Sequence, residues 1–494
     1  MKKNTILENI KIEKLVFWWK GFVRLDDGRI CFITGWAIPW SRVNLKVIKK
    51  KRDFIEAQIT EVIEKSPIET WNYEVIPGTP WINIEYGEQL KIKDTQVKEA
   101  LFHCKKYQEI IPHSPIIPMD NTFWYRNKIE FSFWKYISHR ENIFQDFNIW
   151  FHKRWDFSRV LDFESCILID ELQNDIYKDI RKYTQASWLP VYDQKTWTWF
   201  WRHLMIRWMH FSEEILLVFS INPNYFESID QKTIEIEKLK KYLSELLVIK
   251  YPKITSIYIS HNTNKADTLI WELELVYGSE TISEIILWYS FDIGPKSFFQ
   301  TNSAWAEKLY SLVREFAINS EQNEWNMWNN IKLWTILDLY AGTWTIGMIF
   351  SDIADEVISV ELIEEASRNW EKNARKNQIR NMKFVNEKVE DYLEAYLAEL
   401  CNPAHKEQST NAWNNLLVID PPRAGMHPKA LPNILKFWTQ QIIYVSCNPA
   451  TLGRDLEYIL ANSEYRIEKV QAVDMFPHTH HIEIVVSLIK KTSD

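Results

Sequence analysis

The chain has 494 residues, of which 46% are hydrophobic and 25% charged, and its net charge at pH 7 is −7. This length predicts two to four domains, and the composition excludes a disordered or fibrous chain. Apolar runs stay well short of the ~18 residues that a membrane helix needs, and the N-terminus lacks the apolar region of a signal peptide. We therefore expect a cytoplasmic protein with no membrane partner, and a monomer as the simplest assembly.

The five cysteines lie far apart, without a Cys-x-x-Cys pair. This spacing argues against a disulfide framework, a zinc site and an iron–sulfur cluster, and it favours a reducing compartment. We predict no metal site in the chain.

Glycine and tryptophan occur in abnormal numbers, with 11 Gly and 25 Trp. Glycine usually makes up about 7% of a chain. Several tryptophans stand where turn chemistry favours glycine, namely Trp18, Trp19, Trp40 and Trp328. We infer that many of these residues are glycine in the natively made protein. This would occur in an organism that reads a stop codon as glycine, if the printed sequence translates that codon as tryptophan. The alternative is a protein that is rich in tryptophan, and the masses of peptides from the native protein distinguish the two.

Residues 1–67 predict a small all-β module. Apolar and polar residues alternate as in half-buried strands, in the runs Lys14–Val16, Phe22–Leu25, Arg29–Thr34, Arg42–Lys49 and Phe54–Ile63. Residues 1–52 also carry thirteen Lys and Arg against four Asp and Glu. A basic module on an acidic body is compatible with binding to the phosphates of RNA, although a solvated basic surface explains the charge equally well.

Residues 68–296 predict a mixed α+β domain. Helices are expected at Gly87–Cys104 and Thr233–Val248, and strands at Phe123–Phe133, Phe157–Ile169, Leu204–Ile221, Lys265–Val276 and Thr281–Tyr289. Arg126 and Lys128 lie on the first of these strands. Basic and aromatic residues of this domain could contact an RNA backbone and stack on its bases, but a plain scaffold is an equal alternative.

Residues 297–494 alternate between predicted strands and helices after an opening helix at about 304–317 and a polar linker at Glu321–Asn330. The strands are Leu333–Leu339, Val357–Leu362, Lys383–Asn386, Leu416–Ile419, Ile442–Val445, Arg466–Val473 and Glu483–Ile489, and the helices are Ile363–Asn377, Lys429–Phe437 and Ala450–Leu460. This alternation predicts an open, mostly parallel, Rossmann-like sheet with helices on both faces.

A glycine-containing loop follows the first strand of this domain. It begins at Asp338, contains Tyr340 and Gly342, and has the sequence DLYAGTWTIG. Such a loop lets the backbone approach a nucleotide-like ligand, and an acidic residue about 20 positions later, here Glu361, suits the ribose hydroxyls. The loop alone would also fit a dinucleotide, and a true tryptophan at Trp344 would crowd the ligand.

Asp420 is followed by two prolines and Arg423 at the end of the fourth predicted strand. The prolines restrict the backbone and so hold the carboxylate in one geometry. Asp-Pro-Pro in this place is typical of methyltransferases that act on planar nitrogen or base substrates. A simple turn at the end of a strand is the alternative.

Cys447 ends the fifth predicted strand, at the sheet edge where ligands bind. A lone cysteine is more often a small buried apolar residue than a nucleophile. A thiolate at this edge could nevertheless attack an electrophilic ring carbon. Thiol addition at C6 of uracil makes C5 able to take a methyl group, and a base must then remove the C5 proton so that the thiol can leave. Glu483, at the start of the last predicted strand, is the best candidate for this base.

Three histidines, His478, His480 and His481, lie just before Glu483. A metal site is one interpretation, but no cysteine or carboxylate stands at ligand spacing. We expect these histidines to shape the loop.

Several segments together resemble the RNA (uracil-5-)-methyltransferase family, which uses S-adenosylmethionine to form 5-methyluridine in tRNA or 23S ribosomal RNA. They are FFQTN, DLYAGTWTIG, VELIEEA, DPPRAGMHPKAL, VSCNPATLGRDL and DMFPHTHHIE within residues 297–494, and YRNKIEFSF at 125–133. Residues 6–66 resemble a TRAM domain, a small RNA-binding β-barrel. The resemblance implies a Rossmann-like methyltransferase domain preceded by this barrel and by an α+β domain that contacts RNA.

The resemblance also implies roles for individual residues. Cys447 would be the nucleophile and Glu483 the base that abstracts the proton. The cofactor site would contain Gln300, Asp338, Tyr340, Gly342, Glu361 and Asp420, and the RNA contacts would include Arg126, Lys128, Phe299 and Arg423. The target uridine would be flipped out of its stack to reach Cys447. The TRAM-like module favours 23S ribosomal RNA over tRNA as the substrate.

The chain departs from the family in two ways. Where some members carry an iron–sulfur cluster, residues 76–86 contain no cysteine, so we predict no cluster. Tryptophan also stands at positions where the family has glycine, namely Trp124, Trp155, Trp199, Trp305 and Trp344. Without recoding, the cofactor loop would be blocked and the protein would be an RNA-binding pseudoenzyme. A further alternative is an amino-group methyltransferase that uses only the Asp-Pro-Pro motif and does not need Cys447.

Overall fold

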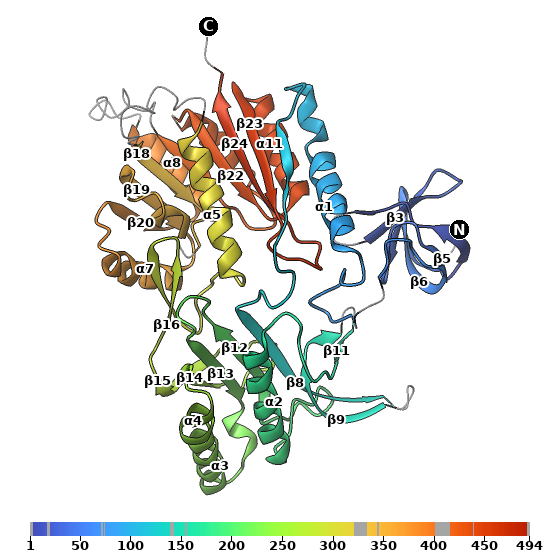
Figure 1. Ribbon diagram of the computed structural model, residues 1–494, viewed down its shortest axis with the longest axis vertical. Coiled ribbons are helices and arrows are strands. Elements are labelled where there is room, and N and C mark those ends of the chain that lie inside the picture. Colours follow the sequence, from blue (N-terminus) through green and yellow to red (C-terminus); the bar gives the residue numbers. More distant parts are fainter. Residues whose placement is uncertain are drawn as a thin grey trace.

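Three large sheets organise the chain in the computed structural model (Figure 1). The structure describes residues 3–16, 20–70, 73, 75–138, 143–153, 156–320, 333–342, 345–400, 415–437 and 439–491. The predicted linker and several of the residues singled out above lie outside these ranges, namely Trp18, Trp19, Trp155, Trp328, Trp344 and Cys401.

The N-terminal sheet has the strand order β1-β5-β6-β4-β3-β2. Its strands are β1 (Ile6–Lys11), β2 (Lys14–Val16), β3 (Lys20–Arg24), β4 (Ile30–Thr34), β5 (Arg42–Lys50) and β6 (Phe54–Glu64). Alternate residues of β5, Val43, Leu45 and Val47, are fully buried, as the alternating pattern predicts. The sequence did not predict β1, whose residues are half polar and mostly exposed.

The central sheet has the order β15-β14-β13-β12-β8-β9. Its strands are β8 (Lys128–Ser138), β9 (Ile143–Trp150), β12 (Trp201–Trp208), β13 (Ile215–Ile221), β14 (Ile254–His261) and β15 (Glu272–Gly278), with α2 (Glu171–Ala186), α3 (Ile229–Lys241), a π-helical turn (Tyr242–Leu247) and α4 (Val248–Lys250) beside it. Short hairpins are formed by β10 (His152–Lys153) with β11 (Asp156–Val160) and by β16 (Ile282–Ile286) with β17 (Tyr289–Ile293).

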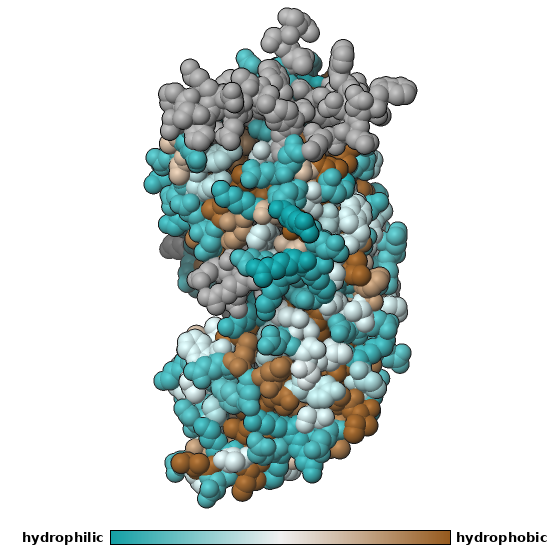
Figure 2. Space-filling model, turned by 90° about the vertical axis from the view of Figure 1, so that its left-hand side faces the viewer, coloured by the Kyte–Doolittle hydropathy of each residue, from teal (hydrophilic) through white to brown (hydrophobic). Residues whose placement is uncertain are grey.

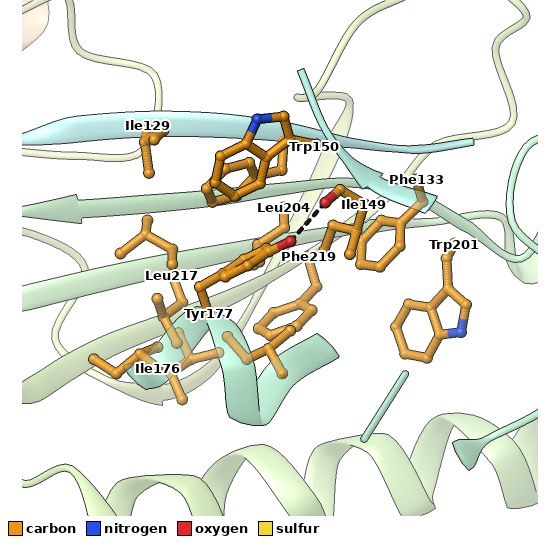
Figure 3. Close-up of a cluster of buried hydrophobic side chains, with 14 of the residues drawn as sticks. Ile129, Phe133, Ile149, Trp150, Ile176, Tyr177, Trp201, Leu204, Leu217 and Phe219 are labelled. Carbon is orange, nitrogen blue, oxygen red and sulfur yellow. Dashed lines mark hydrogen bonds between the residues drawn. The ribbon is translucent and has the colours of Figure 1, made fainter. Parts of the chain in front are cut away.

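An aromatic core joins α2 to the central sheet (Figure 3). Phe131 stacks on Trp150 with ring centroids 5.1 Å apart, and the Tyr177 hydroxyl donates to the Ile149 carbonyl at 2.7 Å. The predicted strand at residues 157–169 is a strand only in β11, and the chain then turns into α2, whose N-cap Asp170 accepts from Gln173 N. The sequence analysis did not predict α2.

The C-terminal sheet has the order β20-β19-β18-β21-β22-β24-β23-β7. The strands from β20 to β22 run parallel, and β24 runs antiparallel to β22 and β23. They are β7 (His113–Ile117), β18 (Leu333–Leu339), β19 (Ala354–Glu361), β20 (Met382–Asn386), β21 (Leu416–Ile419), β22 (Gln441–Ser446), β23 (Tyr465–Val473) and β24 (Glu483–Lys490). The predicted open, mostly parallel sheet is therefore confirmed.

Helices cover both faces of the C-terminal sheet. They are α5 (Ser303–Ile318), α6 (Thr345–Met348), α7 (Glu364–Lys376), α8 (Val389–Leu400), α10 (Ala430–Lys436) and α11 (Pro449–Ala461). Successive residues of a strand serve opposite faces. Leu416 and Val418 of β21 belong to the apolar cluster that contains α5 residues, whereas Leu417 and Ile419 belong to the cluster that contains α10 and α11 residues.

A segment that the sequence analysis placed in the central domain lies on the C-terminal sheet. Helix α1 (Tyr86–Ala100) contacts α11, the 3-10 helix Phe102–Lys106 follows it, and β7 then pairs in parallel with β23. A Cβ atom on Gly453 of α11 would lie 2.2 Å from the Ala100 carbonyl oxygen, so the two helices touch backbone to backbone. No local pattern predicts a pairing between strands about 350 residues apart.

Among the residues that the structure describes, four tryptophans have a positive φ: Trp40 (68°), Trp124 (56°), Trp188 (58°) and Trp197 (59°). A bulky L-residue is strained in this region, whereas glycine adopts it freely. These conformations support the inference that such positions are glycine in the native protein. Of the other proposed positions, Trp305 lies in the first turn of α5 and Trp199 is buried, so neither carries this signal.

Large apolar side chains also reach the surface on and beside α3 and α4, among them Ile229, Ile234, Leu246 and Ile249. On the face shown in Figure 2, apolar side chains are scattered among polar ones over the lower half of the molecule. In the part of the chain that the structure describes, no helix combines the length and apolar character needed to cross a membrane.

Candidate active site

Five of the predicted site residues meet at one edge of the C-terminal sheet. Strand order reverses between β18 and β21, which creates a crevice at their carboxyl ends. Asp338 and Glu361 lie at the ends of β18 and β19, and Asp420 and Cys447 directly follow β21 and β22. Glu483 begins the antiparallel β24, whose amino end reaches the same edge because Ile484 pairs with Ser446.

The loop after β18 closes on the carboxylate of Glu361. Its Oε2 accepts from Gly342 N at 3.0 Å, and its Oε1 accepts from Ile363 N at 3.0 Å. Tyr340 and Gly342 both have positive φ, so the chain turns sharply here. This arrangement presents backbone and an acidic side chain together, as the sequence predicts for a nucleotide-like ligand.

Asp338, in β18 just before this loop, has its side chain inside the protein. It is fully buried, Ser359 Oγ donates to its Oδ2 at 3.2 Å, and burial raises its pKa to about 8. A Cβ atom on Gly347 would lie 2.6 Å from Ser359 Oγ and 2.9 Å from Asp338 Oδ2, so only glycine fits there without displacement. The Asp338 side chain is therefore enclosed between Ser359 of β19 and Gly347 of α6.

Cys447 is half-buried among acidic groups. Burial raises the pKa of its thiol to about 12, with further contributions from Glu483 and Asp420, whereas Arg423 opposes the shift. Burial also raises the pKa of Asp420 to about 7. For Glu483, burial and the Asp420 carboxylate raise the pKa to about 8, against the influence of Arg423. The site thus holds a protonated thiol beside two carboxyl groups that can exchange protons near neutral pH.

Helix α11 holds the loop that carries Arg423. Its N-cap Asn448 donates from Nδ2 to the Arg423 carbonyl at 2.8 Å, and the buried Asp455 accepts from Met426 N at 2.8 Å. Gly425 has φ +77°, and a Cβ there would lie 2.7 Å from Asp455 Oδ2. The sequence did not predict that Asn448 and Asp455 hold this loop. For Asp455, an acidic residue within an amphipathic helix was the available signal.

The FFQTN segment is tied to the central domain. Asn127 donates from Nδ2 to the Gln300 carbonyl at 3.0 Å and from its backbone to the Thr301 carbonyl at 2.8 Å. The side chain of Phe299, which is predicted to contact substrate, is buried against Phe291. Its neighbour Phe298 is 68% exposed and is the aromatic ring available to a ligand.

Two of the three basic residues predicted to contact RNA lie in the central domain. Lys128 is at the start of β8, where its Nζ is 2.6 Å from Glu130 Oε1. Arg126 is half-buried, and its backbone donates to the Leu168 carbonyl at 3.0 Å. The Lys128 ammonium group is thus paired within the protein, and the Arg126 backbone is tied to the segment before α2.

The histidines form part of a loop, as predicted. His478 is buried, which lowers its pKa to about 4, and His481 Nε2 lies 3.5 Å from Arg423 Nη2. Among the described residues, no three His, Cys, Asp or Glu side chains are grouped as metal ligands.

Comparison with known proteins finds a family model that matches the C-terminal part of the chain. The family model described as tRNA (uracil-5-)-methyltransferase matches residues 289–491. An RNA methyltransferase of Porphyromonas gingivalis is 32% identical over 487 residues, covering 95% of this chain and 97% of its own. A second RNA methyltransferase, from Caldanaerobacter subterraneus, is 33% identical over 499 residues, covering 99% and 100%.

Among solved structures, the fold is similar to that of the Pyrococcus abyssi tRNA (uracil-54, C5)-methyltransferase in complex with S-adenosyl-L-homocysteine. The TM-score is 0.68 at 22% identity, with 97% of this chain and 100% of that chain covered.

Proposed function

Because the chain belongs to the tRNA (uracil-5-)-methyltransferase family, we propose that it methylates C5 of a uridine in 23S ribosomal RNA or tRNA, with S-adenosylmethionine as the methyl donor. The observation that carries the proposal is the meeting of Cys447 and Glu483 at the edge that also bears the glycine loop. A thiol and a base at one ligand edge are what C5 methylation requires and what an amino-group transfer does not.

The loop residues suit such a donor. Gly342 and Glu361 form the turn that would hold its nucleoside part, and the exposed Leu362 and Ile363 offer apolar surface beside that carboxylate. S-adenosylmethionine, when bound, supplies the methyl group to the activated C5 carbon. The family resemblance also assigns Gln300 and Asp420 to the cofactor site.

The chain's own residues carry out the remaining steps. Cys447 loses its proton to a neighbouring carboxylate, for which Asp420 with its pKa of about 7 is suited, and its sulfur forms a bond to C6 of the flipped uridine. After C5 is methylated, Glu483 takes the C5 proton. The electron pair of that C–H bond restores the C5–C6 double bond, and the sulfur–C6 bond breaks to release the thiolate.

The experiment that tests this proposal is nucleoside mass spectrometry. The protein made in its own source is incubated with S-adenosylmethionine and unmodified tRNA or 23S ribosomal RNA, and 5-methyluridine is sought in each. We expect 5-methyluridine with wild type and none with Cys447→Ala. Product from Cys447→Ala would favour the amino-group methyltransferase, and no product from wild type on either RNA would favour the RNA-binding pseudoenzyme.

A further inference from the structure

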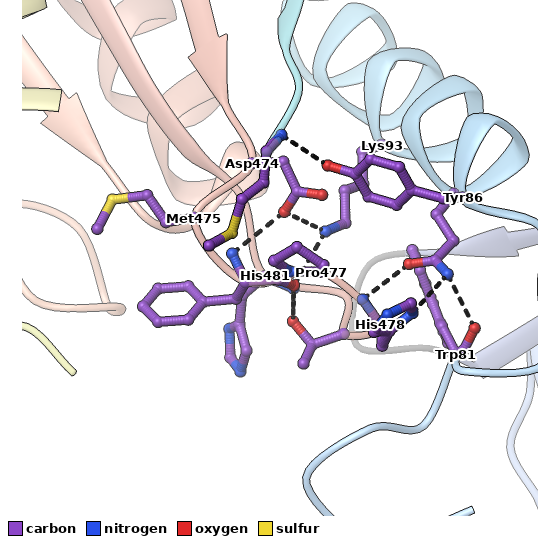
Figure 4. Close-up of polar contacts among 12 residues, drawn as sticks. Trp81, Tyr86, Lys93, Asp474, Met475, Pro477, His478 and His481 are labelled. Carbon is purple, nitrogen blue, oxygen red and sulfur yellow. Dashed lines mark hydrogen bonds and ion pairs between the residues drawn. The ribbon is translucent and has the colours of Figure 1, made fainter. Parts of the chain in front are cut away.

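Helix α1 carries three buried polar side chains on one face: Gln89, Lys93 and Gln96. Their spacing is that of the apolar stripe of a packed helix. Burying polar groups is unfavourable unless each group has a hydrogen-bond partner. The partners of these three side chains therefore show which segments the helix fixes in place. Gln96 donates from Nε2 to the Leu15 carbonyl of the N-terminal sheet at 3.1 Å. Gln89 and Lys93 instead contact the loop before Glu483, where Figure 4 shows Lys93 beside Asp474.

Lys93 forms an ion pair inside the protein. Its Nζ lies 2.7 Å from Asp474 Oδ1, and both side chains are completely buried. Lys93 Nζ also donates to the Phe476 carbonyl at 3.3 Å, and Asp474 Oδ1 accepts from Phe476 N at 3.2 Å. One lysine from the helix thus fixes the first three residues of the loop 474–482, which connects β23 to β24.

Gln89 fixes the next part of this loop. Its Oε1 accepts from His478 N at 2.8 Å, and its Nε2 lies 3.1 Å from His478 Nδ1. The low pKa of His478 leaves its ring neutral, so Nδ1 can accept from the amide. Gln89 Nε2 also donates to the Trp81 and Ile84 carbonyls at 3.0 and 2.8 Å, so this one side-chain amide ties His478 of the loop to the segment before α1.

The loop ends at the proposed catalytic residues. His481 reaches Arg423, and Glu483 follows two residues later as the first residue of β24. Further contacts hold its middle: Tyr125 donates to the Pro477 carbonyl at 3.0 Å, Asn302 donates to the Met475 carbonyl at 2.8 Å, and Trp81 N donates to the His478 carbonyl at 2.8 Å. The helix contacts are the ones that involve a buried charge.

We propose that Lys93 and Gln89 are positioning residues that set the place of Glu483 by holding the loop 474–482. The proposal rests on the proposed function, because it assigns these residues to the step in which Glu483 takes the C5 proton. A misplaced base slows this step but leaves thiol addition and methylation intact, so the methylated Cys447–C6 adduct accumulates. A displacement of about 1 Å is enough to slow a reaction about 100-fold.

The test compares Lys93→Met and Gln89→Met with wild type in single-turnover reactions with RNA and S-adenosylmethionine. Denaturing gels report the covalent protein–RNA adduct, and mass spectrometry reports released 5-methyluridine. We expect adduct resolution to slow about 10- to 100-fold in Lys93→Met, and less in Gln89→Met, relative to methyl transfer. Lys91→Met is the matched control, because Lys91 is exposed on the same helix and pairs with Glu88, and it should behave as wild type.

The outcomes separate the possible failures. A purely structural role lowers the active fraction and reduces adduct and product together, without changing their ratio, which overturns the proposal. Lys93→Met leaves the buried Asp474 carboxylate without its ion-pair partner and could prevent folding. Gln89→Met leaves no buried charge unpaired, so it tests the proposal even if Lys93→Met does not fold. If wild type and Glu483→Gln form neither adduct nor product, the proposed function itself fails and this inference with it. If Glu483→Gln accumulates adduct while Gln89→Met and Lys93→Met resolve it like wild type, only this inference fails.

Discussion

The carboxyl group of Glu483 lies beneath the surface, in the electrostatic field of a second acid. Burial and Asp420 together raise its pKa to about 8, and Arg423 limits the rise. A base with this pKa is substantially ionised at mildly alkaline pH and still retains affinity for a proton. These properties suit a group that must collect the C5 proton.

The raised pKa of Glu483 should lower the stability of the protein as pH rises. Between the ordinary pKa of 4.5 and the folded value of about 8, the folded state holds a proton that the unfolded state has lost, so the free energy of unfolding falls across this window. Glu483→Gln removes the titrating group. We expect the variant to be more stable than wild type at pH 8.5, by roughly 1–4 kcal/mol, and similar near pH 4.5.

Urea unfolding at the two pH values measures this difference. Asp338 and Asp420 also have raised pKa values, so wild type and variant should both lose stability with pH, but the variant should lose less. An equal loss in both proteins would contradict the assignment of a raised pKa to Glu483.

At the scale of the element, the end of α2 shows how a tryptophan can occupy a glycine position. Trp188 follows the C-cap Ser187, has φ +58° and leaves its side chain 93% exposed. A left-handed residue after a helix C-cap is usually glycine. The ring therefore contributes little burial to offset the backbone strain.

Trp188→Gly should stabilise the protein by about 1 kcal/mol, because glycine adopts this conformation without strain. Thermal unfolding of both proteins measures the change. The control is Trp201→Gly, since Trp201 is buried within β12 and its loss should cost about 3–5 kcal/mol. A destabilised Trp188→Gly would contradict the glycine interpretation at this position.

The close contact between α1 and α11 should make the protein sensitive to a larger residue at Gly453. Gly453→Ala would place a Cβ 2.2 Å from the Ala100 carbonyl oxygen, which belongs to the backbone and cannot rotate away. We expect a loss of about 1–3 kcal/mol from overpacking, measured by urea unfolding. Gly294→Ala is the control, because the nearest atom to its Cβ would be 3.7 Å away. An equal loss of stability in this control would show that the close approach at Gly453 is not the cause.

At the scale of the whole molecule, the N-terminal sheet carries a basic segment although the chain as a whole is acidic. The exposed segment Lys49–Arg52 at the end of β5 concentrates four basic residues on the N-terminal sheet of a chain with a net charge of −7. Such a cluster can bind phosphates of RNA and release their counterions.

Lys50→Ala/Lys51→Ala should therefore weaken RNA binding at low salt and reduce the dependence of log Kd on log salt by about 1–2. Filter binding over a range of salt concentrations measures both. The control changes two exposed lysines of α3, Lys238→Ala/Lys241→Ala, at the far end of the molecule in Figure 1. An identical effect of the two double variants would mean that only net charge matters.

Much of the C-terminal sheet followed from local pattern. Leu333–Leu339 and Leu416–Ile419 were predicted with their observed bounds, because short β-branched runs closed by polar or proline residues permit little else. The central sheet was less predictable: α2 went unnoticed, and the strand expected from Phe123 begins only at Lys128. The segment before Lys128 instead bonds to the Leu168 carbonyl through Arg126, a contact that no local pattern encodes.

Local chemistry along the chain was also sufficient to select Cys447, Glu483 and the glycine loop, because ligand edges of parallel sheets gather residues from strand ends. Only tertiary structure decided that Phe298 rather than Phe299 faces outward, that β7 joins β23, and that Lys93 pairs with Asp474. Each of these depends on contacts between distant segments, whose side chains find partners only after the sheets have assembled. Local sequence therefore selects the groups proposed to react, while packing determines what holds them in place.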